Sequence, residues 1–242
     1  MDWSKTKNIL IIALIATNIF LMFTYFTKNQ EVKQNGTQDI ILSVLENKNI
    51  FVDNKIPQKY EKMPAINIEY SKVKRDLVEK NIRTSNYDVS EKPIDEEYKK
   101  VADSFLRDSK ISTDNLKFKT VMLEDNVAMV RYQSNYKGVA IADRYLDVHF
   151  IDGKITDVTK EVIIPTPQSK RKLNIISPEE ALLVFMSEKS GAETVHVENI
   201  EPVFWVNDTS FDGEALLSDT AFPAWQITYN GGKITYIDAY KT

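Results

Sequence analysis

The feature that most constrains this chain is an uncharged apolar run near its amino terminus, residues 9–26. Its 18 residues are just enough to cross the hydrocarbon core of a bilayer as a helix. Lys5 and Lys7 precede the run, so the positive-inside preference places the amino terminus in the cytoplasm and the remainder outside. A cleaved signal peptide is the alternative, but its apolar core is shorter and ends in a small-x-small site, which is missing here. We therefore expect a retained single-pass anchor in the cell membrane.

The predicted span carries a polar residue at mid-depth. A side-chain amide such as that of Asn18 seeks a hydrogen-bonding partner in hydrocarbon, most simply on another helix. Ala13 and Thr17 form a small-xxx-small pair that would allow a second helix to approach closely. A lone Asn tolerated near a water defect is the alternative. The pattern favours Ala13, Thr17 and Asn18 as a partner-contact face within the membrane.

Composition limits the chemistry of the exported part. The chain has 242 residues and no cysteine, which excludes thiol catalysis, thiolate metal sites and iron–sulfur clusters. Once Lys5, Lys7 and Asp2 are set aside, 29 basic and 34 acidic residues remain. A mildly acidic surface of this kind gives no electrostatic reason to bind DNA, RNA or anionic wall polymers.

Hydrophobic periodicity beyond the span predicts an α+β protein. Three helix starts carry local signals: Asp39 and Asp95 as N-caps, and Ser177 with Pro178 and Glu180 as a capping box. The pattern at residues 73–80 fits a strand or a helix. We expect helices over residues 39–49, 94–109 and from 177 to Gly191, and strands over 51–52, 65–70, 117–124, 126–136, 144–151, 154–164, 194–206 (interrupted at Pro202), 221–230 and 233–240.

A repeat is visible in this pattern. Gly-Lys-Ile-Thr occurs at Gly153 and again at Gly232, 79 residues later, each time in a hairpin that follows a helix and further strands. The alternative is that this tetrapeptide is a common hairpin solution. The repeat predicts two units, each a helix followed by an antiparallel meander. The expected divisions are a cytoplasmic tip (1–8), an anchor (9–27), a tether (28–38), a degenerate front segment (39–92), a first repeat (93–166) and a second repeat (167–242).

Between the repeats, Pro165-Thr166-Pro167 is expected to stop the sheet. The basic segment Lys170-Arg171-Lys172 follows it. Three charges are a short patch, so we interpret it as a solvated connector, with an anionic binding site as the alternative.

No catalytic, metal or cofactor site is predicted. The chain has no nucleophile elbow, P-loop, zinc-protease helix, dinucleotide fingerprint or EF-hand loop. His149 and His196 lie in strands with no partner suggested by spacing. Loop carboxylates at Asp208, Asp212 and Glu214 lack the ligand alternation of a calcium loop.

Aromatic residues are concentrated on the predicted strands. We expect them to fill the sheet core, with an exposed subset forming a protein interface as the alternative. They are Tyr132, Tyr136, Tyr145, Phe204, Trp205, Phe222 and Trp225.

Three stretches resemble the YycI (WalI) family of Gram-positive bacteria. They are residues 1–7, MDWSKTK, directly before the apolar run; residues 176–181, ISPEEA, after a Pro-x-Pro and basic link; and residues 222–225, FPAW, before the final hairpin. The resemblance covers essentially the full length. It implies a single-span membrane protein with an extracytoplasmic α+β domain similar in fold to part of the companion protein YycH.

The resemblance also implies a function. YycI proteins are non-enzymatic and have no catalytic residues to carry over. Together with YycH they contact the sensor histidine kinase WalK (YycG), largely through transmembrane helices, and adjust a system that controls cell-wall metabolism. By this resemblance, residues 9–26 would be the surface that contacts the kinase.

Two other classes of function stay open. A membrane-anchored wall-active enzyme requires an open pocket with converging carboxylates or a His–acid pair. An extracytoplasmic binding module for a wall fragment, peptide or lipid requires a concave apolar cleft lined by exposed Tyr and Trp.

Overall fold

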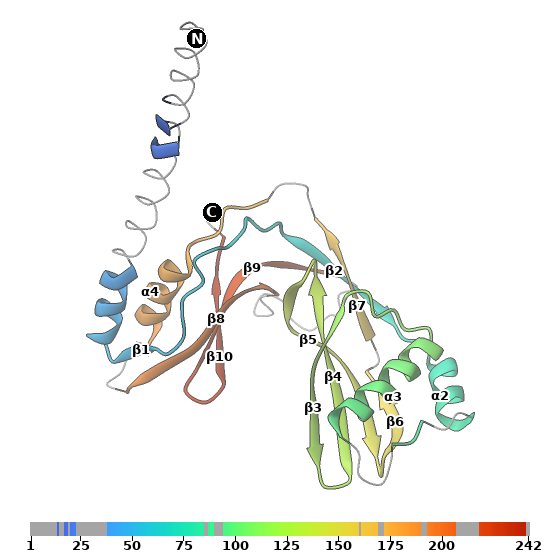
Figure 1. Cartoon of the computed structure of the whole chain (residues 1–242). Coiled ribbons are helices and arrows are strands. Elements are labelled where there is room, and N and C mark those ends of the chain that lie inside the picture. The colour runs from blue at the N-terminus through green and yellow to red at the C-terminus, as the bar shows by residue number, and fades with distance from the viewer. Residues whose placement is uncertain are drawn as a thin grey trace, which may run out of the picture.

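The computed structural model describes residues 14, 17–18, 20–22, 38–84, 87–89, 94–159, 161–168, 172–189, 193–206 and 218–240. Its fold is α+β, as expected, with a large and mainly antiparallel sheet (Figure 1). Residues 38–46 are helical, and the later helices are α2 (Arg75–Thr84), α3 (Asp95–Asp108) and α4 (Pro178–Glu188).

The sheet has ten strands, in the order β3-β4-β5-β8-β9-β2-β7 along its main path, with β1 on β8, β10 on β9 and β6 on β5. Among the pairings of the described residues, only β1–β8 and β5–β8 are parallel. The strands are β1 (Ile50–Val52), β2 (Ile66–Lys72), β3 (Leu116–Glu124), β4 (Val127–Tyr136), β5 (Val139–Ile151), β6 (Lys154–Val158), β7 (Glu161–Pro167), β8 (Val195–Trp205), β9 (Ser218–Tyr229) and β10 (Lys233–Asp238).

Two large hydrophobic cores lie at opposite ends of this sheet. In one, α2 and α3 pack on β4, β5 and β6, with Phe105 and Phe150 fully buried. In the other, α4 and the helix over residues 38–46 pack near β8, β9 and β10, with Phe185 and Trp225 fully buried (Figure 1). Along the described chain, α3 is followed by the antiparallel pairs β3–β4, β4–β5 and β5–β6, and α4 by the antiparallel pairs β8–β9 and β9–β10. The front segment contributes to both cores, because β2 lies in the core that contains α4, whereas α2 lies in the core that contains α3.

The predicted strand over residues 154–164 is wrong in its extent. The structure divides it into β6, which pairs with β5, and β7, which pairs with β2. The expected stop at Pro165-Thr166-Pro167 comes later than predicted, since both prolines lie in β7 and the strand ends at Pro167. Gln168 donates its N–H to the carbonyl of Ala65, on the side where β2 lies. Backbone nitrogens along a strand point alternately to its two sides, so those of Pro165 and Pro167 point away from β2, toward the open edge of the sheet. Proline is tolerated there because that edge requires no donor.

Other local predictions change in smaller ways. The predicted N-caps Asp39 and Asp95 are wrong, since each lies inside its helix. In α3, Ile94 holds the N-cap position and makes no side-chain cap hydrogen bond. Pro202 does not interrupt β8. β5 begins at Val139 rather than at residue 144, because Lys137 and Gly138 form a two-residue turn with positive φ angles of 50° and 86°.

The undecided segment at residues 73–80 falls largely in α2. The hairpin at Asp152-Gly153 and the capping box of Ser177 are confirmed. The Ser177 hydroxyl accepts from the Glu180 N–H at 3.1 Å, and the Glu180 carboxylate accepts from the Ser177 N–H at 2.9 Å.

Candidate functional site

The residues expected to contact a partner helix are only partly described. Thr17 and Asn18 are helical and exposed, whereas Ala13 and most of residues 9–26 lie outside the described residues. Within the portions that the structure describes, no helix reaches the length and apolarity needed to cross a bilayer.

The helix over residues 38–46 follows the predicted tether directly. Leu45 is fully buried in the core that also contains α4. Ile40 and Val44 lie on the outer side and are 67% and 40% exposed. One face of this helix thus fixes the start of the folded domain, while the other presents apolar side chains to solvent.

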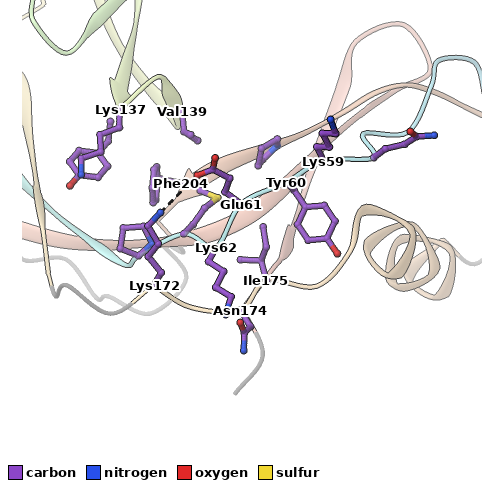
Figure 2. A pocket seen from close by; sticks show the side chains of 15 residues that line it. Lys59, Tyr60, Glu61, Lys62, Lys137, Val139, Lys172, Asn174, Ile175 and Phe204 are labelled. Carbon is purple, nitrogen blue, oxygen red and sulfur yellow. Dashed lines mark ion pairs between the residues drawn. The ribbon is translucent and has the colours of Figure 1, made fainter. Parts of the chain in front are cut away.

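A groove of about 1060 Å³ lies between residues 58–64, the β4–β5 turn and residues 172–175, along β8 (Figure 2). This volume slightly exceeds the range for small-molecule sites, about 300–1,000 Å³. Phe204 and Tyr136 meet edge to face in the groove lining, with ring centroids 5.7 Å apart, and both are largely buried. Tyr60 is 40% exposed and packs edge-on against the buried Trp225.

Backbone hydrogen bonds hold the walls of the groove together. Leu173 donates its N–H to the carbonyl of Met63 at 2.7 Å, which joins the two strand-like segments on either side. Ile176 donates to Ala239 at 2.6 Å, and its own carbonyl accepts from Trp225 Nε1 at 3.0 Å. Residues 173–176, which follow the basic link, are therefore tied to both the front segment and the last strand region.

Lysines surround the groove. Lys59, Lys62, Lys137 and Lys172 line it, and Glu61 is the acidic side chain among its described lining residues. Glu61 lies 3.8 Å from Lys172 but is 90% exposed, so this ion pair is weak. Lys137 extends over the ring of Tyr136, with its ammonium 5.3 Å from the centroid.

Sequence reasoning missed this groove because four separate segments build it. One signal in the sequence indicated it, namely the basic link, which we interpreted as a solvated connector with an anionic binding site as the alternative. Lys172 of that link does line the groove. Lys170 and Arg171 lie outside the described residues, as do the loop carboxylates Asp208, Asp212 and Glu214.

The structure gives one histidine a partner that spacing did not suggest. His196 Nδ1 lies 3.1 Å from Asp53 Oδ1, and the ring of Phe51 stacks on His196 with centroids 5.5 Å apart. Both members of the pair are about half exposed. Both contacts of His196 follow directly from the parallel β1–β8 pairing, in which Phe51 lies opposite His196. This arrangement indicates a surface link that holds β1 in place.

A network on the outer side of the first meander has the strongest ion pair of the described residues by geometry. Arg131 donates to both carboxylate oxygens of Asp147, at 2.8 and 2.7 Å, and its guanidinium lies 4.5 Å from the ring centre of Tyr145. Hydrogen bonding to Asp147 raises the pKa of Arg131 against the effect of burial. Such bidentate pairing stabilises the β4–β5 register.

In the part of the chain that the structure describes, no group of three His, Asp or Glu side chains could hold a metal ion. The predicted aromatic core is confirmed for Trp225, Phe204, Tyr132 and Tyr136, which are buried. Tyr145, Trp205 and Phe222 are half-buried.

Comparison with known proteins relates the chain to one family. The sequence model of the YycI protein family matches residues 28–240. No curated protein matches the chain. Among solved structures, the C-terminal domain of Bacillus megaterium YpeB is similar with a TM-score of 0.39 and 15% identity, over 64% of this chain and 64% of that one. The family match extends over most of the sequence, and this chain belongs to the YycI family.

Proposed function

We propose that this chain is a non-enzymatic, membrane-anchored regulator of a WalK (YycG)-like sensor histidine kinase that controls cell-wall metabolism. In this proposal residues 9–26 span the membrane with the amino terminus in the cytoplasm. The span contacts the kinase and a YycH-like partner, and the extracytoplasmic domain sets the position of the span.

The match to a regulatory family is the observation that carries the proposal. The burial of Leu45 supports the proposed coupling between the folded domain and the span, because it attaches the helix that follows the tether to the core of that domain. A partner helix can shift a kinase between two states only by binding one of them better. A coupling of about 1–3 kcal/mol between the two proteins would be typical.

The first experiment tests the contact within the membrane. Asn18→Leu removes the side-chain amide and should reduce co-purification of the kinase from detergent-solubilised membranes. Ile12→Leu is the matched control, since successive residues of a helix turn by about 100° and Ile12 would therefore lie about 100° or more around the helix from each of Ala13, Thr17 and Asn18. Equal recovery of the kinase with both variants would count against the proposed face.

The second experiment tests whether the span itself acts on the kinase. Replacing residues 9–26 with a polyleucine helix should abolish regulation of a kinase-dependent reporter while leaving the extracytoplasmic domain folded. Full regulation by the polyleucine chain would defeat the proposal. Crosslinking from positions 13, 17 and 18 in living cells would identify the neighbour directly.

A further inference from the structure

We infer that the lysine-lined groove binds an extended acidic peptide segment of another protein, one that carries apolar side chains between its carboxylates. The inference concerns the extracytoplasmic domain alone and does not depend on the proposed contact between membrane helices.

Charge is the first support. Lys59, Lys62, Lys137 and Lys172 exceed the acidic lining residue Glu61 by three positive charges, in a chain whose formal net charge is −4. The local excess is therefore not a consequence of general basicity. Within the described residues, Lys172 has an ion pair with Glu61, and no ion pair involves Lys59 or Lys62. These ammonium groups complement an anionic partner.

The surface between the lysines is the second support. Met63, Ile175 and Phe204 are buried side chains that line the groove, joined by the half-buried Val139 and Pro202. Figure 2 shows the lysines and Phe204 around one hollow, contributed by different segments of the chain. An apolar floor with cations around it suits a ligand with anionic and apolar groups in alternation. A small anion such as phosphate would leave most of about 1060 Å³ unfilled.

The position along the sheet favours a peptide over a lipid. β8 pairs with β1 at residues 195–197 and with β5 at Phe204. Between these contacts, residues 198–203 have a strand neighbour only on the β9 side, within the part of the chain that the structure describes. Pro202 and Phe204, from this stretch and its end, line the groove. Extended peptides commonly bind along sheet edges and place alternate side chains in adjoining pockets.

The test uses the full chain in micelles of an uncharged detergent and a fluorescent decapeptide of alternating glutamate and tyrosine. We expect saturable binding by fluorescence anisotropy, weakened by added salt. A decapeptide of alternating lysine and tyrosine should not bind, and one of alternating glutamate and serine should bind at least several-fold more weakly. Binding of all three peptides with equal affinity would overturn the inference.

Paired variants locate the site. Lys62→Gln with Lys137→Gln removes two lining charges, each worth a factor of up to about five in affinity, and should weaken binding about tenfold. Lys100→Gln with Lys233→Gln removes two exposed lysines that do not line the groove and should change affinity less than twofold. Equal weakening by both pairs would overturn the inference. Circular dichroism checks that each variant remains folded.

A lipid arm separates the other class of anionic partner. The chain is mixed with vesicles of phosphatidylglycerol or of phosphatidylcholine, and the groove pair is compared with the control pair. If phosphatidylglycerol vesicles bind in a manner sensitive to Lys62→Gln with Lys137→Gln while the acidic peptide does not bind, the groove is a lipid site and the peptide inference is wrong.

Discussion

Leu45→Ala should separate the folded domain from the helix that follows the tether. Leu45 is fully buried, and its truncation removes three carbons, worth about 2.4 kcal/mol at about 0.8 kcal/mol each. The cavity left behind raises the expected loss of unfolding free energy to about 3–4 kcal/mol. For a chain of this length, that corresponds to a fall in Tm of about 10 °C.

Thermal and denaturant unfolding of the full chain, followed by tryptophan fluorescence, measures this loss. Trp225 is a suitable reporter because it is buried in the same core as Leu45. Val44→Ala is the control, since Val44 is 40% exposed on the same helix and its truncation should change stability by less than about 0.5 kcal/mol. Similar unfolding free energies for the two variants would refute the anchoring role of Leu45. If the anchoring also positions the span, only Leu45→Ala should weaken regulation in cells.

Three further predictions concern single contacts. Gly153→Ala should lower the free energy of unfolding by about 1 kcal/mol more than Gly138→Ala does, as measured by denaturant unfolding. Both glycines have positive φ, but only at Gly153 would the new Cβ lie 2.8 Å from the side chain of Val89. Equal losses for the two variants would contradict this. Ser177→Ala should lower the free energy of unfolding by about 1 kcal/mol. The double variant Ser177→Ala with Glu180→Ala should lose less than the sum of the two single variants, and additive losses would contradict the capping box. Burial raises the pKa of Asp157, but hydrogen bonds from Arg75 and the Val158 N–H outweigh it and the pKa is lowered. Asp157→Asn should therefore lose stability at neutral pH, and the gap from the unchanged protein should close as acid protonates Asp157.

Local signals in the sequence predicted local structure well. The capping box of Ser177 needs only residues three apart, and the Asp152-Gly153 turn needs only adjacent ones, so both could be recognised without knowing the fold. The proline rule failed for the opposite reason. Pro165 ends a strand only if its nitrogen faces a neighbouring strand that needs a hydrogen-bond donor. Which way the nitrogen faces is set by pairing with β2, about a hundred residues earlier in the chain.

Long-range pairing also explains the missed histidine partner. β1 and β8 are separated by more than a hundred residues, and their parallel register places Phe51 opposite His196, with Asp53 just beyond. No periodicity within either strand indicates this register. The same holds for β2, which lies between β9 and β7 and so joins segments that the repeat pattern had treated as separate.

The groove shows why net charge is a poor guide to binding. The mildly acidic composition gave no electrostatic reason to bind DNA, RNA or anionic wall polymers, yet Lys59, Lys62, Lys137 and Lys172 line one hollow. Screening limits charge interactions to about 8 Å at physiological salt, so a partner senses the charges beside it rather than the total. The lysines come from segments that meet only in the folded chain. Under the proposed function, the folded domain would need a surface that distinguishes partners, and a basic groove with an apolar floor has the charge and shape for that role.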